Sequence, residues 1–130
     1  LAQVFANLIS NAIKYSDAAG TIRIDTGADG WRQRFVWPAI GRRSGVFGSQ
    51  RIYRGTPGSY HSGADVAVPT GTPVTAPADG VVILAAEQPF TLEGNLLMID
   101  HGMGLNSAFL HLSSIAVHNG QAVRQGLCMQ

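Results

Sequence analysis

The sequence has a single cysteine, Cys128, so the chain cannot form an internal disulfide bond. Cys128 lies near the chain end, where chains fray, and no second group stands at metal-ligand spacing from it. Charge is also scarce: nine lysines and arginines face eight aspartates and glutamates, for a formal net charge of +1. Because this balance lacks a basic excess, and Arg42–Arg43 is the densest basic run, we expect no nucleic-acid partner.

Long apolar runs are missing as well. No run approaches the ~18 residues needed to span a bilayer, and no charged segment followed by an apolar one marks a signal peptide. The first residue is Leu1 rather than Met, so we expect an internal piece of a longer gene product. With 130 residues, 45% hydrophobic and 13% charged, the composition is typical of a folding chain with at most one modest domain.

Two different apolar periodicities follow each other along the chain. Residues 1–16 place apolar side chains at helical spacing, and residues 21–26 alternate as a half-buried strand does. From residue 35 onward, short apolar runs recur between Gly, Pro and Asn: Asp65–Val68, Pro73–Ala76, Gly80–Ala86, Leu96–Asp100 and Leu105–Leu112. This pattern predicts a mainly β fold, an antiparallel β-sandwich or partly open barrel, preceded by an N-terminal α-helix.

A turn-like linker, Gly-Ala-Asp-Gly at residues 27–30, separates the two patterns. We place the junction between Asp29 and Arg34. The sequence therefore predicts a helix, strand and linker over residues 1–30, and a β domain over residues 31–130 that is incomplete at its C-terminal end. Within that domain, residues 101–104 predict a hairpin turn between the last two apolar runs.

The stretch from Gly58 to Asp65, Gly-Ser-Tyr-His-Ser-Gly-Ala-Asp, carries the strongest chemical signal. Fully extended, His61 and Asp65 would lie about 13 Å apart, whereas one zinc ion holds both ligand atoms within ~2.0–2.2 Å of itself. The chain must therefore bend if the two side chains share a metal, and Gly63 permits an unusual bend. The residues alone favour a different reading, a surface-turn histidine and an aspartate that caps a loop.

This stretch and the blocks around it resemble the M23 family of zinc metallopeptidases, the lysostaphin-like peptidoglycan hydrolases. The resemblance covers roughly residues 35–126, and the other blocks follow in the family's order: Trp37-Pro38 with Ser44–Gly48, Ala76–Val82, Gly94-Asn95, Asp100–Gly104, Phe109–Ser113 and Gly120–Val123. It implies an M23-type β fold, a zinc cofactor held by His61 and Asp65, and peptidoglycan peptide as the substrate. It also implies a place in the cell envelope, the periplasm or outside the cell.

His111 is the candidate catalytic residue. Alternation over residues 107–113 puts His111 on the side opposite Leu110 and Leu112, away from the more apolar face, as expected for a cleft residue. The resemblance implies that His111 helps to activate the water or to stabilise the developing oxyanion. The alternative is a cross-strand partner without chemistry. We expect His61, Asp65 and His111 to converge on one cleft, and His101 and His118 to take no part.

The second signature of the M23 family is absent. M23 enzymes carry a His-x-His pair beyond the Gly-Gln turn, one histidine being the third zinc ligand and the other catalytic, and this sequence contains no His-x-His. The resemblance thus implies an endopeptidase core truncated before its last ligand, with weak or absent zinc and little hydrolysis. The alternative is a non-catalytic M23-like module that binds cell-wall peptide or another partner. The sequence sets no oligomeric state.

A separate resemblance covers residues 1–26. The run from Asn7 to Ser16 is similar to the N-box of the histidine kinase ATP-binding domain. There the asparagine matching Asn11 holds the magnesium ion of the nucleotide, and the residues matching Lys14 and Tyr15 lie near its phosphates and base. A phosphate site needs groups from several segments, so we prefer a helix that docks by its apolar face. A histidine kinase ATP-binding fragment remains the third interpretation.

Overall fold

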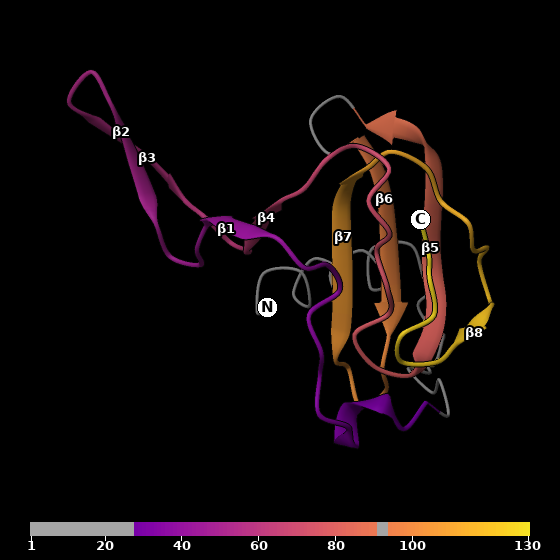
Figure 1. Cartoon of the computed structure of the whole chain (residues 1–130). Helices are drawn as coiled ribbons and strands as arrows, with labels where there is room; N and C mark the ends of the chain where they lie inside the picture. The colour runs from indigo at the N-terminus through magenta and orange to yellow at the C-terminus, as the bar shows by residue number, and fades with distance from the viewer. Residues whose placement is uncertain (1–27, 91–93) are drawn as a thin grey trace, which may run out of the picture.

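The computed structural model describes residues 28–90 and 94–130, in which the regular structure is almost entirely β (Figure 1). A short 3-10 helix, η1 (Gly30–Arg32), precedes the strands β1 (Arg42–Gly45), β2 (Gln50–Tyr53), β3 (Thr56–Tyr60), β4 (Asp65–Ala67), β5 (Gly80–Phe90), β6 (Gly94–Asp100), β7 (Asn106–Leu112) and β8 (Ala122–Val123). Every strand pair is antiparallel, which confirms the predicted fold class. The helix expected over residues 1–16 lies outside the described residues, and these contain no helix able to cross a bilayer.

The largest sheet has four strands in the order β7-β6-β5-β8. Its strand β6 is covered on both sides, because Leu97 and Ile99 are fully buried and their neighbours Met98 and Asp100 are only 8% and 3% exposed. The apolar runs predicted over residues 80–86 and 96–100 are therefore strands, and β5 continues further, to Phe90. The hydrophobic core of the described residues is built on this sheet.

A second layer, made of residues 74–76 and 126–129, covers one face of this sheet (Figure 1). The N–H of Ala76 donates to the Leu127 carbonyl at 2.9 Å, and the N–H of Met129 donates to the Val74 carbonyl at 2.8 Å. The run expected as a strand over residues 73–76 contributes only an isolated bridge there. The expectation of a frayed C-terminal end was wrong, because Met129 is fully buried. The core comprises Val74, Ala76, Val82, Leu97, Ile99, Leu112, Val117, Val123 and Met129.

Two smaller pairs, β1 with β4 and β2 with β3, form an arm that extends away from the four-stranded sheet (Figure 1). The tip of the arm turns through Arg54 and Gly55, whose φ values of 49° and 83° are both positive, as a type I′ hairpin requires. Every residue of β2 and β3 is exposed. These strands bury no face, so the apolar runs used to predict the other strands could not reveal them.

The β6–β7 hairpin confirms the turn predicted over residues 101–104. Asp100 pairs with Asn106, and the N–H of His101 donates to the Leu105 carbonyl at 2.8 Å. The η1 helix sits against this turn, because the N–H of Trp31 donates to the His101 carbonyl at 2.9 Å. The residues that directly follow the predicted linker therefore already pack against the β domain. The domain boundary at residue 30 stays a prediction.

Candidate metal centre

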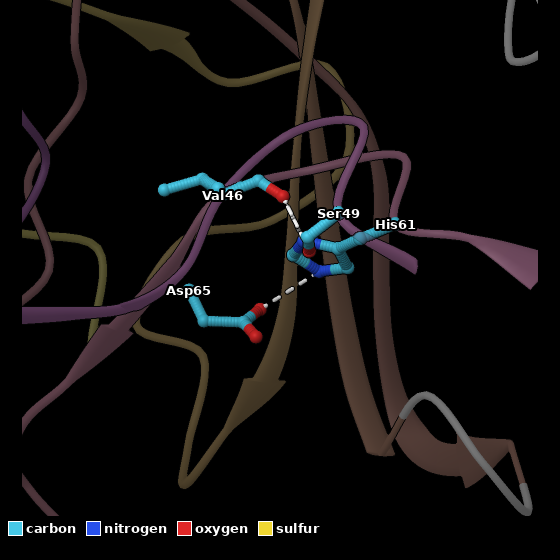
Figure 2. A network of polar contacts seen from close by, with 4 residues as sticks. All are labelled: Val46, Ser49, His61 and Asp65. Carbon is cyan, nitrogen blue, oxygen red and sulfur yellow. Dashed lines mark hydrogen bonds and ion pairs between the residues drawn. The ribbon is translucent and has the colours of Figure 1, made fainter. Parts of the chain in front are cut away.

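His61 and Asp65 meet in the middle of the arm, where the β2–β3 pair joins the β1–β4 pair. His61 directly follows β3 and Asp65 opens β4, and Nε2 of His61 lies 3.1 Å from Oδ1 of Asp65 (Figure 2). Their side chains are 33% and 50% exposed, so a small ion can reach both atoms from solvent. The chain bends at Gly63, as expected, but Gly63 is not among the residues with positive φ. An ordinary backbone therefore brings the two predicted ligands together, and their role as ligands stays a prediction.

The other ring nitrogen of His61 contacts a backbone carbonyl. Nδ1 lies 3.1 Å from the oxygen of Val46, and the same oxygen accepts the Ser49 hydroxyl at 2.8 Å and the Ser49 N–H at 3.2 Å (Figure 2). The backbone of His61 is held too, since its N–H donates to the Ser49 carbonyl and its carbonyl accepts the Gly48 N–H, each at 2.8 Å. Residues 46–49 therefore fix both the backbone and the ring of His61.

The contacts that hold His61 depend on a tight turn over residues 46–49. The Ser49 N–H bonds back to the Val46 carbonyl, and Gly48 has a φ of +78°. A positive φ at the third position is what a type II turn requires, and glycine adopts it without a steric penalty. Gly48 thus allows the Val46 carbonyl to face the His61 ring.

The His61–Asp65 pair fits two corners of a zinc site. A neutral imidazole carries one N–H, and when this N–H is at Nδ1, where it meets the Val46 carbonyl, the lone pair of Nε2 points at Asp65. Two ligand atoms on one tetrahedral zinc ion lie about 3.3 Å apart. The observed 3.1 Å between Nε2 and Oδ1 is close to that separation. The two atoms thus need only a small adjustment to share one ion.

The described residues supply no third ligand. Within residues 28–90 and 94–130, no group of three or more histidine, cysteine, aspartate or glutamate side chains is placed to hold a metal ion. His111 therefore does not complete the pair as a ligand, and Cys128 bonds elsewhere, with its thiol donating to the Gln130 carbonyl at 2.9 Å. Within the described residues, the His61–Asp65 pair therefore offers two of the ligand atoms that a zinc ion needs.

His111 lies at an irregularity of β7. Leu97 pairs with Phe109 and Asn95 with Leu112, so two steps along β6 correspond to three along β7. One extra residue is therefore inserted in β7 between these pairs, which is a β-bulge. His111 lies in this bulge and has a φ of +60°, a left-handed conformation that is uncommon for a residue other than glycine.

The bulge overturns the predicted alternation of β7. Phe109, expected on the open face, packs against the core, whereas Ala108 and Leu110, expected on the apolar face, are exposed. After the bulge the order reverses, so that Leu112 is buried and His111 is exposed. His111 is accessible as expected, but because of the bulge and not because of a regular period of two. Its catalytic role stays a prediction.

His101 serves the fold, as the sequence indicated. Its side chain is fully buried, with Nδ1 2.7 Å from the Asp79 carbonyl and Nε2 2.9 Å from the Ser107 hydroxyl. The ring of Phe35 packs against it edge-on, with ring centres 4.8 Å apart. These contacts satisfy both ring nitrogens and tie the β6–β7 turn to the start of β5. His118, by contrast, is exposed in a turn.

Asp79 also has a structural role. Its Oδ1 accepts the N–H of Gln125 at 2.7 Å, which links the start of β5 to the C-terminal segment. This hydrogen bond, followed by one from the side chain of Gln33, lowers the pKa of Asp79 below its ordinary value of 3.8. The charged form is favoured because both donors point at the carboxylate. Asp79 is therefore a hydrogen-bond acceptor that links the start of β5 to the C-terminal segment.

An apolar groove of about 350 Å³ runs beside the edge strand β7. At its rim, the guanidinium of Arg43 lies 5.6 Å from the centre of the Trp37 ring. The groove is lined by Phe35, Val36, Trp37, Pro38, Pro77, Ser107, Ala108 and Phe109.

Sequence reasoning missed the Val46 carbonyl and Ser49. A backbone carbonyl has no signature in the sequence, and Ser49 lies twelve residues before His61, outside any local motif. The one available signal was Gly48, a glycine between two apolar residues and a polar strand, which is typical of a turn.

Residues 59–128 match the family described as Peptidase family M23. The chain belongs to this family. It is 38% identical over 95 residues to the peptidoglycan DD-endopeptidase ShyA of Vibrio cholerae, a match that covers 72% of this chain and 22% of that protein. It is 39% identical over 93 residues to the cell division protein DipM of Caulobacter vibrioides, covering 72% of this chain and 14% of that one.

The fold has solved counterparts as well. The crystal structure of a zinc-containing peptidase from Vibrio cholerae superposes with a TM-score of 0.66 and 30% identity, over 75% of this chain and 31% of that one. The M23 chain therefore spans less than a quarter of the two relatives named above and about a third of this solved structure. The mainly β expectation and the M23 resemblance are both confirmed.

Proposed function

We propose that this M23 chain is the core of a zinc-dependent endopeptidase that cleaves peptide cross-links of peptidoglycan in the cell envelope. His61 and Asp65 are two of the zinc ligands, and His111 is the catalytic histidine. The observation that carries the proposal is the approach of Nε2 of His61 to Oδ1 of Asp65, at 3.1 Å, with Nδ1 placed on the Val46 carbonyl. The relative named as a peptidoglycan DD-endopeptidase supports the substrate class.

Each residue has a defined task in this proposal. His61 and Asp65 present a nitrogen and an oxygen lone pair toward one point, and the partial exposure of both leaves that point open to water. A zinc ion bound there lowers the pKa of a water molecule and polarises a carbonyl group. His111, exposed on the bulge of β7, is the group that accepts or donates a proton.

A matched set of variants tests the zinc site. Calorimetric titration of the 130-residue chain should show weak zinc binding that His61→Ala or Asp65→Ala abolishes. His118→Ala, which changes an exposed histidine outside the site, should leave the affinity unchanged. Zinc binding that survives both His61→Ala and Asp65→Ala would remove the basis of the proposal.

A second experiment tests the activity. Because the described residues lack a third ligand, we expect the 130-residue chain to release no fragments from cross-linked peptidoglycan. The same chain fused at its C-terminus to a segment carrying His-x-His should bind zinc tightly and release peptide fragments, and Asp65→Ala in that fusion should stop the release. A fusion that binds zinc but cleaves nothing would contradict the enzymatic proposal.

The second candidate is a non-catalytic module that binds cell-wall peptide. It is favoured by the absence of a three-ligand group within the described residues, and by the apolar groove beside β7. The fusion separates the two candidates, since a binding module would co-sediment with peptidoglycan and release nothing. The histidine kinase interpretation rests on residues 1–26, which lie outside the described part of the chain.

A further inference from the structure

The two oxygens that flank the His61 ring compete for one proton. Nδ1 lies 3.1 Å from the Val46 carbonyl oxygen, and Nε2 lies 3.1 Å from the carboxylate of Asp65. Both oxygens only accept hydrogen bonds, while a neutral imidazole has a single N–H to give. In either neutral tautomer, one ring nitrogen therefore turns a lone pair toward an oxygen. A cation between Nε2 and Oδ1 removes this conflict, but only when the proton is at Nδ1.

We propose that Ser49 is a positioning residue that, through the Val46 carbonyl, holds the proton of His61 at Nδ1 and so leaves Nε2 free for a metal ion. This inference rests on the proposed zinc site and adds the group that prepares it. The partner of a metal-bound histidine at its second nitrogen generally fixes the tautomer and the ring orientation. Here that partner is a backbone carbonyl, and its direction depends on Ser49.

Two hydrogen bonds from Ser49 orient this carbonyl. The hydroxyl donates at 2.8 Å and the N–H at 3.2 Å, so the oxygen of Val46 is held at the inner side of the turn (Figure 2). The hydrogen bond from the Ser49 N–H to the Val46 carbonyl is long, and the Ser49 hydroxyl makes the shorter hydrogen bond to the same oxygen. Without the hydroxyl, the carbonyl can turn toward solvent, because Val46 and Ser49 are not buried.

The backbone of His61 is fastened to the same turn, which keeps the ring in reach. The His61 N–H donates to the Ser49 carbonyl, and the Gly48 N–H donates to the His61 carbonyl, each at 2.8 Å. Removing only the Ser49 hydroxyl leaves these two bonds in place. Ser49→Ala therefore changes the ring's partner without releasing the backbone, and it separates positioning from folding.

The first test needs no metal and is made in an Asp65→Ala background, where the carboxylate no longer attracts the proton. Long-range proton–nitrogen NMR at a pH where imidazole is neutral should show His61 mainly protonated at Nδ1. Adding Ser49→Ala should shift the population toward Nε2–H, the form that a solvated imidazole prefers. Ser49→Thr, which keeps a hydroxyl, should restore Nδ1–H, and Ser59→Ala, on the same arm, should change nothing. The His61 signals are identified by their loss in His61→Ala.

The second test measures zinc affinity with Asp65 intact. Outer-sphere partners of metal-bound histidines typically contribute about 10–100-fold in affinity, and Ser49 acts one bond further out, so we expect Ser49→Ala to weaken zinc about 10-fold. Ser49→Thr should bind as the parent chain does. A ring mainly protonated at Nε2 with Ser49 present, or a tautomer ratio unmoved by Ser49→Ala, overturns the inference. The expected tautomer shift together with a His-x-His fusion that binds no zinc would instead overturn the proposed function.

Discussion

Gly45 on β1 pairs directly with Asp65 on β4, and a methyl group on Gly45 would collide with the Asp65 carboxylate. The carboxylate lies across the neighbouring strand because that position has no side chain. Gly45 is not among the residues with positive φ, so alanine is compatible with its backbone. The glycine is therefore needed for the space it leaves beside the Asp65 carboxylate.

We predict that Gly45→Ala displaces the Asp65 carboxylate from Nε2 of His61 and weakens zinc binding about 10-fold or more. The loss should appear in calorimetric titration, with little change in the melting temperature, because the site is exposed. Gly63→Ala is the matched control: nothing lies within 4 Å of an added methyl group there, and its φ is not positive. Equal zinc affinity of the two variants would contradict this role for Gly45.

Gly48 offers a test of the turn itself. Its φ is +78° and no atom lies within 4 Å of an added methyl group, so Gly48→Ala incurs only the conformational cost of a left-handed residue, about 1–2 kcal/mol. We expect faster hydrogen exchange of the His61 amide, which bonds to the Ser49 carbonyl. The His61 amide should exchange more slowly in Gly48→Asn than in Gly48→Ala, because asparagine tolerates the left-handed conformation better than alanine does. Indistinguishable rates for all three chains would contradict the type II turn.

The strands β5, β6 and β7 were predictable because each buries part of its length, and the β2–β3 hairpin, which buries none, was missed. The unbroken apolar run from Leu96 to Ile99 marked β6 in the sequence. The β2–β3 hairpin is exposed throughout, so no apolar run marked it in the sequence. A strand that buries side chains needs apolar residues, which can be recognised in the sequence. A hairpin held by backbone hydrogen bonds alone places no such requirement on its side chains.

The proximity of His61 and Asp65 was predictable from the sequence, but the groups that hold His61 in place were not. The spacing of His61 and Asp65 and the family blocks indicated the pair before the structure placed its atoms 3.1 Å apart. The Val46 carbonyl could not be predicted, because any residue at that position has one. The exposure of His111 was expected from strict alternation, yet it depends on a β-bulge. One residue inserted into a strand moves every later side chain to the opposite face of the sheet.

His101 provides a stability prediction. His101→Ala removes a fully buried ring and leaves the Asp79 carbonyl and the Ser107 hydroxyl without their partner, so we expect a loss of about 3 kcal/mol or more in the free energy of unfolding. Urea denaturation measures it. His118→Ala, at an exposed turn, should stay within about 0.5 kcal/mol of the parent chain. A similar small effect at both positions would show that the His101 contacts do not stabilise the turn.

Asp79 provides a prediction about pH. The pKa of Asp79 in the folded chain is below its ordinary value of 3.8, which holds in the unfolded chain. At a pH between the folded pKa and 3.8 the unfolded chain binds more protons, so the free energy of unfolding rises with pH. The stabilisation is complete above 3.8 and is lost as the pH falls through the folded pKa. Asp79→Asn should flatten the dependence of unfolding free energy on pH in this acid range. An unchanged pH dependence in Asp79→Asn would contradict this role of the Asp79 carboxylate.

The strained backbone at His111 offers a test of its proposed catalytic role. A residue other than glycine at a φ of +60° is strained, and such strain often lies at sites whose conformation serves chemistry. His111→Gly removes this strain but adds the chain entropy of glycine, so we expect a net gain of about 0.5–1 kcal/mol in the free energy of unfolding. Leu110→Gly, at the neighbouring exposed residue without positive φ, should lose stability instead.

In the His-x-His fusion, His111→Gly should retain zinc and lose hydrolysis, because His111 is not a ligand of the proposed site. A fusion that still cleaves peptidoglycan at the parental rate without His111 would show that the strained conformation serves something other than catalysis.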